Sequence, residues 1–273
     1  MSTTDRPTIS VLVITLNEER MLDRVLESVR WADEIVIVDS GSTDRTEEIA
    51  RRYTSHFYVL PYEGHGIQRQ RTYELSTGGW ILYIDADEIV TPALRDSILS
   101  SVRGPGGRSG FRMQLHTWFL GRWFGRSGWR KEWKVRLFRR DRGAFDGRAI
   151  HEGARVEGPI GTLSGALLHY PYRDLTHAVE KMNRYSTSMV DMRLSSGRTS
   201  SAPAAVLRGF GRFFRDYIAG GEFLLGGPGL IRSTLNAYYT FLKYAKLWER
   251  SNAGTVPTDV ARAPSHGPPE PRQ

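Results

Sequence analysis

Three carboxylates follow one short apolar segment, and their types and spacing suit metal-assisted chemistry. The segment Trp80-Ile-Leu-Tyr-Ile-Asp85-Ala-Asp87-Glu88 begins with aromatic and β-branched residues, which predicts a strand buried on both faces. Asp85 and Asp87 are two positions apart, so they would project to the same side of an extended backbone. Two like charges this close favour a divalent cation with oxygen preference, Mg²⁺ or Mn²⁺. The alternative is a solvated acidic turn in which Glu88 opens a helix.

The elements that must position these carboxylates are visible in the apolar pattern. Strands are expected at residues 9–14, 35–38 and 56–60, ahead of the one at 80–85. Helical spacing or capping signals lie in the intervals between them. Strand and helix alternate four times, which predicts an α/β fold with a doubly wound, mostly parallel sheet. Right-handed crossovers allow the strand order 3-2-1-4.

Polar residues stand where the first two of these strands end. Thr15 and Asn17 follow the first strand, and Asp39 closes the second. In an open parallel sheet ligands bind beyond the carboxyl ends of the strands, so these residues should face the same crevice as Asp85 and Asp87. Asp39 could accept hydrogen bonds from a base or a ribose. Alternatively, it is a turn aspartate whose side chain accepts hydrogen bonds from the backbone of its own turn.

The composition separates two halves of the chain. Residues 1–100 hold 10 Lys and Arg against 17 Asp and Glu, whereas residues 103–148 hold 13 against 3. The absence of cysteine excludes disulfides, thiolate metal sites and a cysteine nucleophile. The N-terminus lacks a signal-peptide profile and no apolar run reaches 18 residues, which predicts a cytoplasmic protein. The loop at Gly41 has neither a dinucleotide fingerprint nor a P-loop lysine.

The basic middle of the chain interleaves aromatic residues, glycines and arginines between Trp118 and Trp129. Sugar rings pack on indole, and arginines meet phosphate or carboxylate groups, so this segment suits an anionic glycan. It equally suits single-stranded nucleic acid, which stacks on aromatic rings. A third interpretation is a loop whose tryptophans complete the core.

Amphipathic helices are expected near the C-terminus. Residues 204–218 carry an apolar stripe with arginines off it. The stripe is Val206, Phe210, Phe213, Phe214 and Tyr217, and the arginines are Arg208, Arg212 and Arg215. We hypothesise that this helix holds the protein at an anionic membrane surface. The same pattern is expected if the helices simply cap the rest of the protein.

Residues 9–19, 35–44 and 80–88 together resemble, in order and spacing, the nucleotide-sugar half of a family 2, GT-A-type glycosyltransferase. The sequence around His151-Glu152 and the helix from His177 to Leu194 resemble one branch, the enzymes of lipopolysaccharide core assembly, often β-1,4-glucosyltransferases. The resemblance covers roughly residues 8 to 248. It implies a nucleotide-sugar-binding half at 1–102, an acceptor-binding and catalytic half at 103–175, and a C-terminal helical region at 176–250. The Pro, Gly, Ala and Ser content from residue 251 predicts a disordered tail at 251–273.

The resemblance also implies roles for single residues. The nucleotide-sugar would be bound by Thr15, Asn17, Glu18, Asp39, Arg69 and Asp85. Asp87 would ligate Mg²⁺ or Mn²⁺ at the diphosphate, with Asp85 at the ribose or the metal. Glu152, with Asp146 as the other candidate, would deprotonate the acceptor. His169 is either a phosphate or metal partner or a structural histidine.

The expected function is therefore inverting transfer of a hexose, such as glucose, from a nucleotide-diphosphate sugar, with a UDP-sugar expected. The acceptor would be a lipopolysaccharide core or another lipid-linked glycan at the cytoplasmic face of the membrane. A sugar nucleotidyltransferase is a rival interpretation, against which the missing Gly-rich, Lys-bearing loop counts. A nucleic-acid-binding protein using residues 103–148 is another, but it leaves the acidic half unexplained.

Overall fold

The computed structural model describes residues 7–125, 131–145, 153–195 and 197–252. The candidate bases Asp146 and Glu152, Trp129 and the C-terminal tail lie outside the described residues. Contacts divide the chain into two compact units, one of residues 1–178 and 217–232 and the other of residues 179–216 and 233–273.

The first unit is built on one mixed sheet. Its first elements are β1 (Ile9–Thr15), α1 (Leu22–Val29), β2 (Glu34–Asp39), α2 (Thr46–Ala50), β3 (Phe57–Val59), α3 (His65–Glu74) and β4 (Trp80–Asp85). They are followed by β5 (Glu88–Val90), α4 (Pro92–Arg103), β6 (Gly110–Phe119), β7 (Arg122–Phe124), β8 (Glu132–Arg139), a small pair β9 (Gly143–Ala144) and β10 (Arg155–Val156), and β11 (Ile160–His169).

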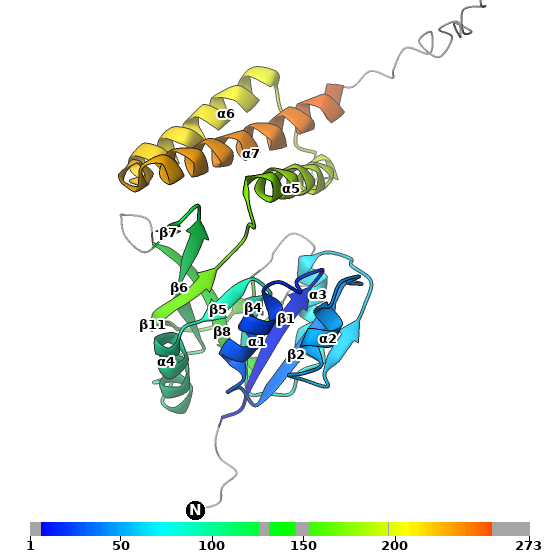
Figure 1. Cartoon of the computed structure of the whole chain (residues 1–273), viewed down its shortest axis with the longest axis vertical. Helices are drawn as coiled ribbons and strands as arrows, with labels where there is room; N and C mark the ends of the chain where they lie inside the picture. Colours follow the sequence, from blue (N-terminus) through cyan, green and yellow to red (C-terminus); the bar gives the residue numbers. More distant parts are fainter. Residues whose placement is uncertain (1–6, 126–130, 146–152, 196, 253–273) are drawn as a thin grey trace, which may run out of the picture. The chain divides into compact units, whose positions relative to one another are not determined.

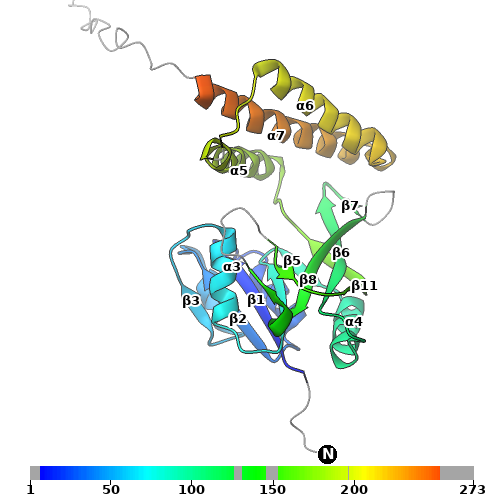
Figure 2. The same ribbon diagram turned by 180° about the vertical axis from the view of Figure 1, so that it is seen from behind.

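The first four strands are parallel and lie in the order β3-β2-β1-β4, which is the order that right-handed crossovers allow. Alternate residues of β1 enter opposite cores, Val11 and Val13 on one face and Leu12 on the other. Helices α1, α2 and α4 contribute to the first core. Figure 1 shows α1 and α2 in front of the sheet, and Figure 2 shows α3 in front of its other face. The expected doubly wound α/β fold is confirmed.

The sheet then changes direction. β8 pairs antiparallel to β4 and β6, and β11 lies parallel to β6 and antiparallel to β5. The register sets His169 opposite Glu88, so the end of β11 reaches the residues that follow β4. A bulge in β11 contains Gly165, whose φ of +85° suits a residue without a Cβ. An added Cβ there would lie 2.4 Å from the backbone nitrogen of Leu94 in α4.

Helices dominate the C-terminal part, with α5 (Leu175–Ser195), α6 (Ala202–Phe214) and α7 (Gly227–Asn252). Short helical turns at Arg215–Ala219 and Glu222–Leu225 connect α6 to α7. Ser201 caps α6 by accepting a hydrogen bond from the Ala204 backbone, and Pro203 lies in its first turn. Among the residues described, none of the helices has the length and apolar content needed to span a bilayer.

Candidate active site

The loops after β1 and β2 are held together by their own polar groups. Thr15 Oγ1 donates to Asp39 Oδ2 at 2.7 Å, and the Asn17 amide oxygen accepts from the Thr43 backbone at 2.8 Å. Asn17 adopts a φ of +55°, a conformation that asparagine tolerates better than most residues. The backbone of Glu18 donates to Thr46 Oγ1. The structure therefore brings these sequence-predicted residues together at one edge of the sheet.

Asp39 is only 2% exposed, and its carboxylate accepts four hydrogen bonds. Besides Thr15, the donors are the backbone nitrogens of Gly41 and Ser42 and the Ser42 hydroxyl. Gly41 has a φ of +94°, so the turn needs a glycine there. This geometry matches the alternative in which Asp39 organises its own turn. The predicted contact with a base stays a prediction.

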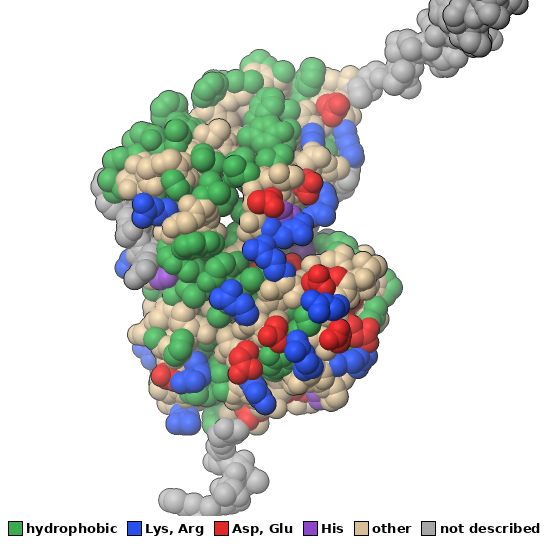
Figure 3. Space-filling model, in the orientation of Figure 1, with side chains coloured by type: hydrophobic (Ala, Val, Ile, Leu, Met, Phe, Trp, Pro, Cys, Tyr) green, Lys and Arg blue, Asp and Glu red, His purple; other side chains and the backbone are tan. Residues whose placement is uncertain are grey.

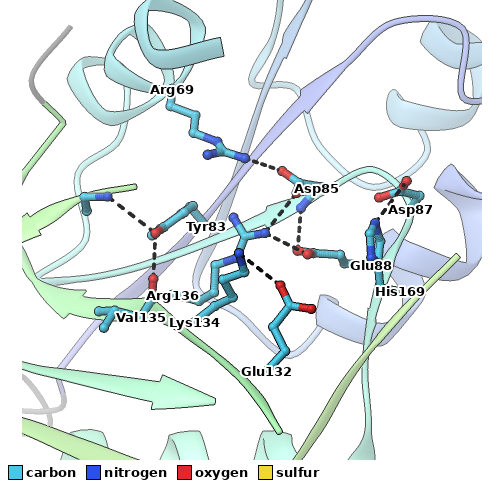
Figure 4. Close-up of polar contacts among 11 residues, drawn as sticks. Arg69, Tyr83, Asp85, Asp87, Glu88, Glu132, Lys134, Val135, Arg136 and His169 are labelled. Carbon is cyan, nitrogen blue, oxygen red and sulfur yellow. Dashed lines mark hydrogen bonds and ion pairs between the residues drawn. The ribbon is translucent and has the colours of Figure 1, made fainter. Parts of the chain in front are cut away.

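Asp85 lies between two buried arginines (Figure 4). Its Oδ1 is 2.6 Å from Arg69, which comes from α3, and its Oδ2 is 2.9 Å from Arg136, which comes from β8. The ring of Tyr83 lies beneath both guanidiniums, at 5.3 Å from Arg69 and 4.8 Å from Arg136. Burial alone would raise the pKa of Asp85, but the charges of Arg136 and Arg69 hold it well below its usual range.

Glu88 completes this ion-pair network. Its carboxylate lies 2.7 Å from Arg136 and also accepts from the Asp85 backbone at 2.9 Å, which closes the turn after β4. Glu88 is 1% exposed and begins β5, so the alternative of a solvated turn that opens a helix is wrong. The following helix, α4, starts at Pro92 and is capped by Thr91. Burial raises the pKa of Glu88.

Asp87 faces the imidazole of His169, with 3.5 Å between Oδ2 and Nε2 (Figure 4). The backbone carbonyl of Asp87 also accepts a hydrogen bond at 2.9 Å from the backbone nitrogen of Tyr170, the residue that follows His169. Burial would lower the pKa of His169, but the hydrogen bond and charge of Asp87 outweigh it and raise the pKa. His169 Nδ1 is buried and has no hydrogen-bond partner among the residues that the structure describes.

Sequence reasoning missed Arg136. The alternation of residues 134–140 predicts a strand but gives no reason to place this arginine inward, and it is 6% exposed. The antiparallel register of β8 on β4, with Leu137 opposite Leu82, carries Arg136 alongside Tyr83. The only sign in the sequence that Arg136 is buried is its position between the apolar residues Val135 and Leu137.

An aromatic surface adjoins the acidic residues. Trp118 on β6 and Trp123 on β7 lie opposite each other, with ring centroids 5.0 Å apart. Trp123 also contacts the ring of Tyr170 at 5.5 Å. Because Tyr170 is hydrogen-bonded to the Asp87 backbone, this hairpin is anchored next to the carboxylates. Trp118 is partly exposed.

A doubly wound sheet with acidic and arginine side chains at the carboxyl edge of β4 defines a GT-A-type glycosyltransferase. The family profile described as "Glycosyl transferase family 2" matches residues 10–103. A lipopolysaccharide core biosynthesis glycosyltransferase of Rhizobium meliloti (strain 1021), LpsC, is 32% identical over 249 residues, covering 89% of this chain and 92% of the relative. The chain belongs to glycosyl transferase family 2.

Other similar proteins include an uncharacterized glycosyltransferase of Rickettsia typhi (strain ATCC VR-144 / Wilmington), 26% identical over 255 residues, or 89% of this chain and 87% of that one. A crystal structure of glucosyl-3-phosphoglycerate synthase from Mycobacterium tuberculosis with Mn²⁺ and uridine-diphosphate-glucose is 26% identical, with a TM-score of 0.33. That match covers 42% of this chain and 44% of that one. Membership in a glycosyltransferase family favours transfer over the nucleotidyltransferase and nucleic-acid interpretations.

Proposed function

We propose that this glycosyltransferase moves a hexose from a nucleotide-diphosphate sugar, with a UDP-sugar expected, to an anionic or lipid-linked glycan such as a lipopolysaccharide core. We propose that transfer inverts the anomeric centre and depends on Mg²⁺ or Mn²⁺. The observation that carries this proposal is the pairing of Asp87 with His169 beside the buried cluster of Asp85, Glu88 and the arginines.

The charge balance of the cluster supports a divalent cation. The carboxylates of Asp85 and Glu88 face the two guanidiniums of Arg69 and Arg136, and the carboxylate of Asp87 faces His169. Both arginines are already neutralised by these carboxylates, so the residues alone offer little excess positive charge to a diphosphate. A bound divalent cation would supply that charge.

The donor set at Asp87 and His169 fits Mn²⁺ or Mg²⁺. Asp87 Oδ2 and His169 Nε2 lie 3.5 Å apart, so both could ligate one cation, and the described residues give His169 Nδ1 no hydrogen-bond partner. The described residues contain no group of three or more His, Cys, Asp or Glu that could hold a metal. Two protein ligands completed by water and substrate phosphates are usual for Mg²⁺ in nucleotide sites. When bound, the cation would stabilise charge on the departing diphosphate.

The other residues of the site orient the donor. Asp39 fixes the Gly41-Ser42 turn, whose shape would receive the nucleoside. The role proposed for Asp85 is to hold Arg69 and Arg136 on either side of its carboxylate, because each of its oxygens already has an arginine partner. Its ligation to a metal or a ribose remains a prediction from family resemblance.

The chemical step needs a base on the side of the anomeric carbon opposite the diphosphate. We assign this role to Glu152, with Asp146 as the other candidate. Glu152 would take the proton of the acceptor hydroxyl as its oxygen bonds to the anomeric carbon. The bond from that carbon to the diphosphate oxygen breaks in the same step, which inverts the configuration.

The aromatic hairpin is the proposed acceptor platform. Trp118 and Trp123 offer indole rings beside Tyr170, the residue that joins the hairpin to Asp87. Arg112, which lies over the Trp133 ring at 5.2 Å, adds a cation on the same strand as Trp118. Sugar rings stack on such aromatic surfaces, and an arginine binds phosphate or carboxylate groups of an anionic glycan. A lipid-linked acceptor would bring the enzyme to the cytoplasmic face of the membrane.

A panel of nucleotide sugars tests the proposal. The purified protein is incubated with each donor and Mn²⁺, with and without a lipopolysaccharide-core acceptor, and the released nucleoside diphosphate is measured. We expect one UDP-hexose to be turned over fastest and the acceptor to raise its rate. Equal, negligible release from every donor, with acceptor present, would contradict the proposed reaction.

A further inference from the structure

Helix α6 exposes large apolar side chains on one side. Leu207 is 69% exposed, Phe210 62% and Phe214 59%, and Val206 is also exposed. Positions separated by three, four, seven and eight residues lie on one side of a helix, so these four form a continuous strip. We call Val206, Leu207, Phe210 and Phe214 the apolar face of α6. Of the expected stripe, Val206, Phe210 and Phe214 face solvent, whereas Phe213 and Tyr217 are half-buried.

The opposite side of α6 is already used within the second unit. Ala205 and Gly209 are buried, and a Cβ on Gly209 would lie 3.3 Å from Phe241 of α7. Further along, buried Asp216 accepts hydrogen bonds from Arg212 at 2.5 Å and from Asn236 of α7 at 3.0 Å. The apolar face is thus separate from the surface with which α6 packs on α7.

The first unit has exposed apolar residues of its own. The segment of residues 217–232, which belongs to the first unit, exposes Ile218, Phe223, Leu224, Leu230 and Ile231. Figure 3 shows hydrophobic side chains gathered over the region of α6 and α7, with few charged side chains among them. An exposed apolar strip such as the one on α6 marks an interaction site.

The charges near the apolar face are positive. Residues 202–215 include Arg208, Arg212 and Arg215 but no Asp or Glu. Asp216 pairs with Arg212 and also with the half-exposed Arg215 at 3.4 Å, while Arg208 rests on the Tyr244 ring at 4.1 Å. A second copy bound through the same face would bring these arginines towards their counterparts. An anionic surface would complement them.

We infer that the apolar face of α6 docks on an anionic phospholipid surface, with its aromatic and aliphatic side chains in the boundary between headgroups and acyl chains. An amphipathic helix lies in that boundary when its apolar side is exposed and its flanks are basic. Because Arg212 and Arg215 both contact Asp216, the apolar face supplies most of the attraction, and Arg208 and the half-exposed Arg215 add selectivity for anionic lipid. The inference agrees with a lipid-linked acceptor but does not depend on it.

Vesicle sedimentation tests this inference on the full chain. The key variant combines Leu207→Gln, Phe210→Gln and Phe214→Gln, and the control combines Val59→Gln with Ile160→Gln, which are exposed apolar residues of the first unit. With vesicles containing phosphatidylserine, we expect the key variant to lose at least tenfold in partitioning and the control to match wild type. Arg208→Gln with Arg215→Gln should weaken binding to anionic vesicles less and should leave binding to neutral vesicles unchanged.

Two further measurements separate the possible outcomes. Thermal unfolding should give the same midpoint for the key variant and wild type, because the replaced side chains are exposed. Turnover of soluble nucleotide sugar should also persist, so a failure of the donor reaction is distinguishable from a failure of docking. Binding by the key variant equal to that of wild type would overturn the inference. So would a wild-type dimer in sedimentation velocity that the three substitutions dissociate.

Discussion

Asp87 Oδ2 lies 3.5 Å from His169 Nε2, although one residue follows β4 and the other ends β11. The neighbouring carboxylates and Asp87 raise the pKa of this histidine against the effect of burial. The carboxylates around His169 therefore favour a positive charge at the place where the proposed reaction needs a cation. The pairing of β11 with β5, which sets His169 opposite Glu88, creates this relationship.

Arg136 should be essential for both the fold and turnover. Arg136→Gln leaves Asp85 and Glu88 without their shared cation in a buried position, which should cost about 3–5 kcal/mol of unfolding free energy. Urea unfolding measures that loss. The control Lys134→Gln, on the same strand with a side chain 48% exposed, should cost less than about 1 kcal/mol. Equal stability of the two variants would contradict the role given to Arg136.

Arg136→Lys separates positioning from charge. It keeps a cation but not the planar group that lies on Tyr83 and reaches both carboxylates, so the lysine variant should fold yet lose turnover. We expect a fall in kcat of at least about tenfold, which corresponds to roughly 1.4 kcal/mol. Wild-type kcat in a folded lysine variant would show that Arg136 serves stability alone.

Asp39→Ala should weaken binding of UDP. The substitution removes the acceptor of the Gly41 and Ser42 backbone groups and of Thr15, so the turn that faces the nucleoside loses its shape. We expect roughly 10- to 100-fold weaker UDP binding by calorimetry, the equivalent of about 1.5–3 kcal/mol. A folded variant that binds UDP as tightly as wild type would assign Asp39 to the turn only.

Much of this architecture follows from local pattern. The apolar runs of β1, β2 and β4 and the helices between them predict the order β3-β2-β1-β4, because short parallel connections leave few alternatives. The carboxyl ends then meet at one edge, which places Thr15, Asp39 and Asp85 together. The sequence does not tell whether Asp39 binds a base or accepts hydrogen bonds from the backbone of its own turn, because an aspartate serves both roles.

The rest depends on contacts between distant segments. Nothing local to residues 134–140 tells which neighbour β8 will pair with, so the burial of Arg136 was not predictable. The sequence leaves His169 as either a phosphate or metal partner or a structural histidine, because its position beside Asp87 depends on the pairing of β11 with β5. The stripe on α6 predicts an amphipathic helix, but a buried stripe and an exposed one have the same spacing.

The two candidate bases should differ when each is replaced. Glu152→Gln keeps the shape of the side chain but cannot take a proton, so turnover should fall by about 10²–10⁴-fold while UDP binding is unchanged. Asp146→Asn should retain most of the activity. Initial rates at saturating donor measure both. The reverse ranking would transfer the role of base to Asp146.

Gly165 should be intolerant of a side chain. Gly165→Ala adds a Cβ within 2.4 Å of the Leu94 backbone in addition to the strain of its positive φ. The matched control is Gly121→Ala, which has a φ of +79° and open space around the new Cβ. The control should cost roughly 1–2 kcal/mol, and Gly165→Ala about 1–3 kcal/mol more. Thermal unfolding measures the stability of both variants. Equal losses of stability would mean that α4 shifts away from the new Cβ at no cost.

The central claim is that a divalent cation at Asp87 binds the diphosphate, and calorimetry of UDP binding tests it most directly. Wild type is titrated with UDP in Mn²⁺ and in EDTA, alongside Asp87→Asn and the exposed control Asp96→Asn in Mn²⁺. We predict at least tenfold weaker binding in EDTA and in Asp87→Asn, unchanged binding in Asp96→Asn, and a loss of turnover of about 10²-fold or more without metal. Equal UDP affinity and full turnover in EDTA would contradict the claim.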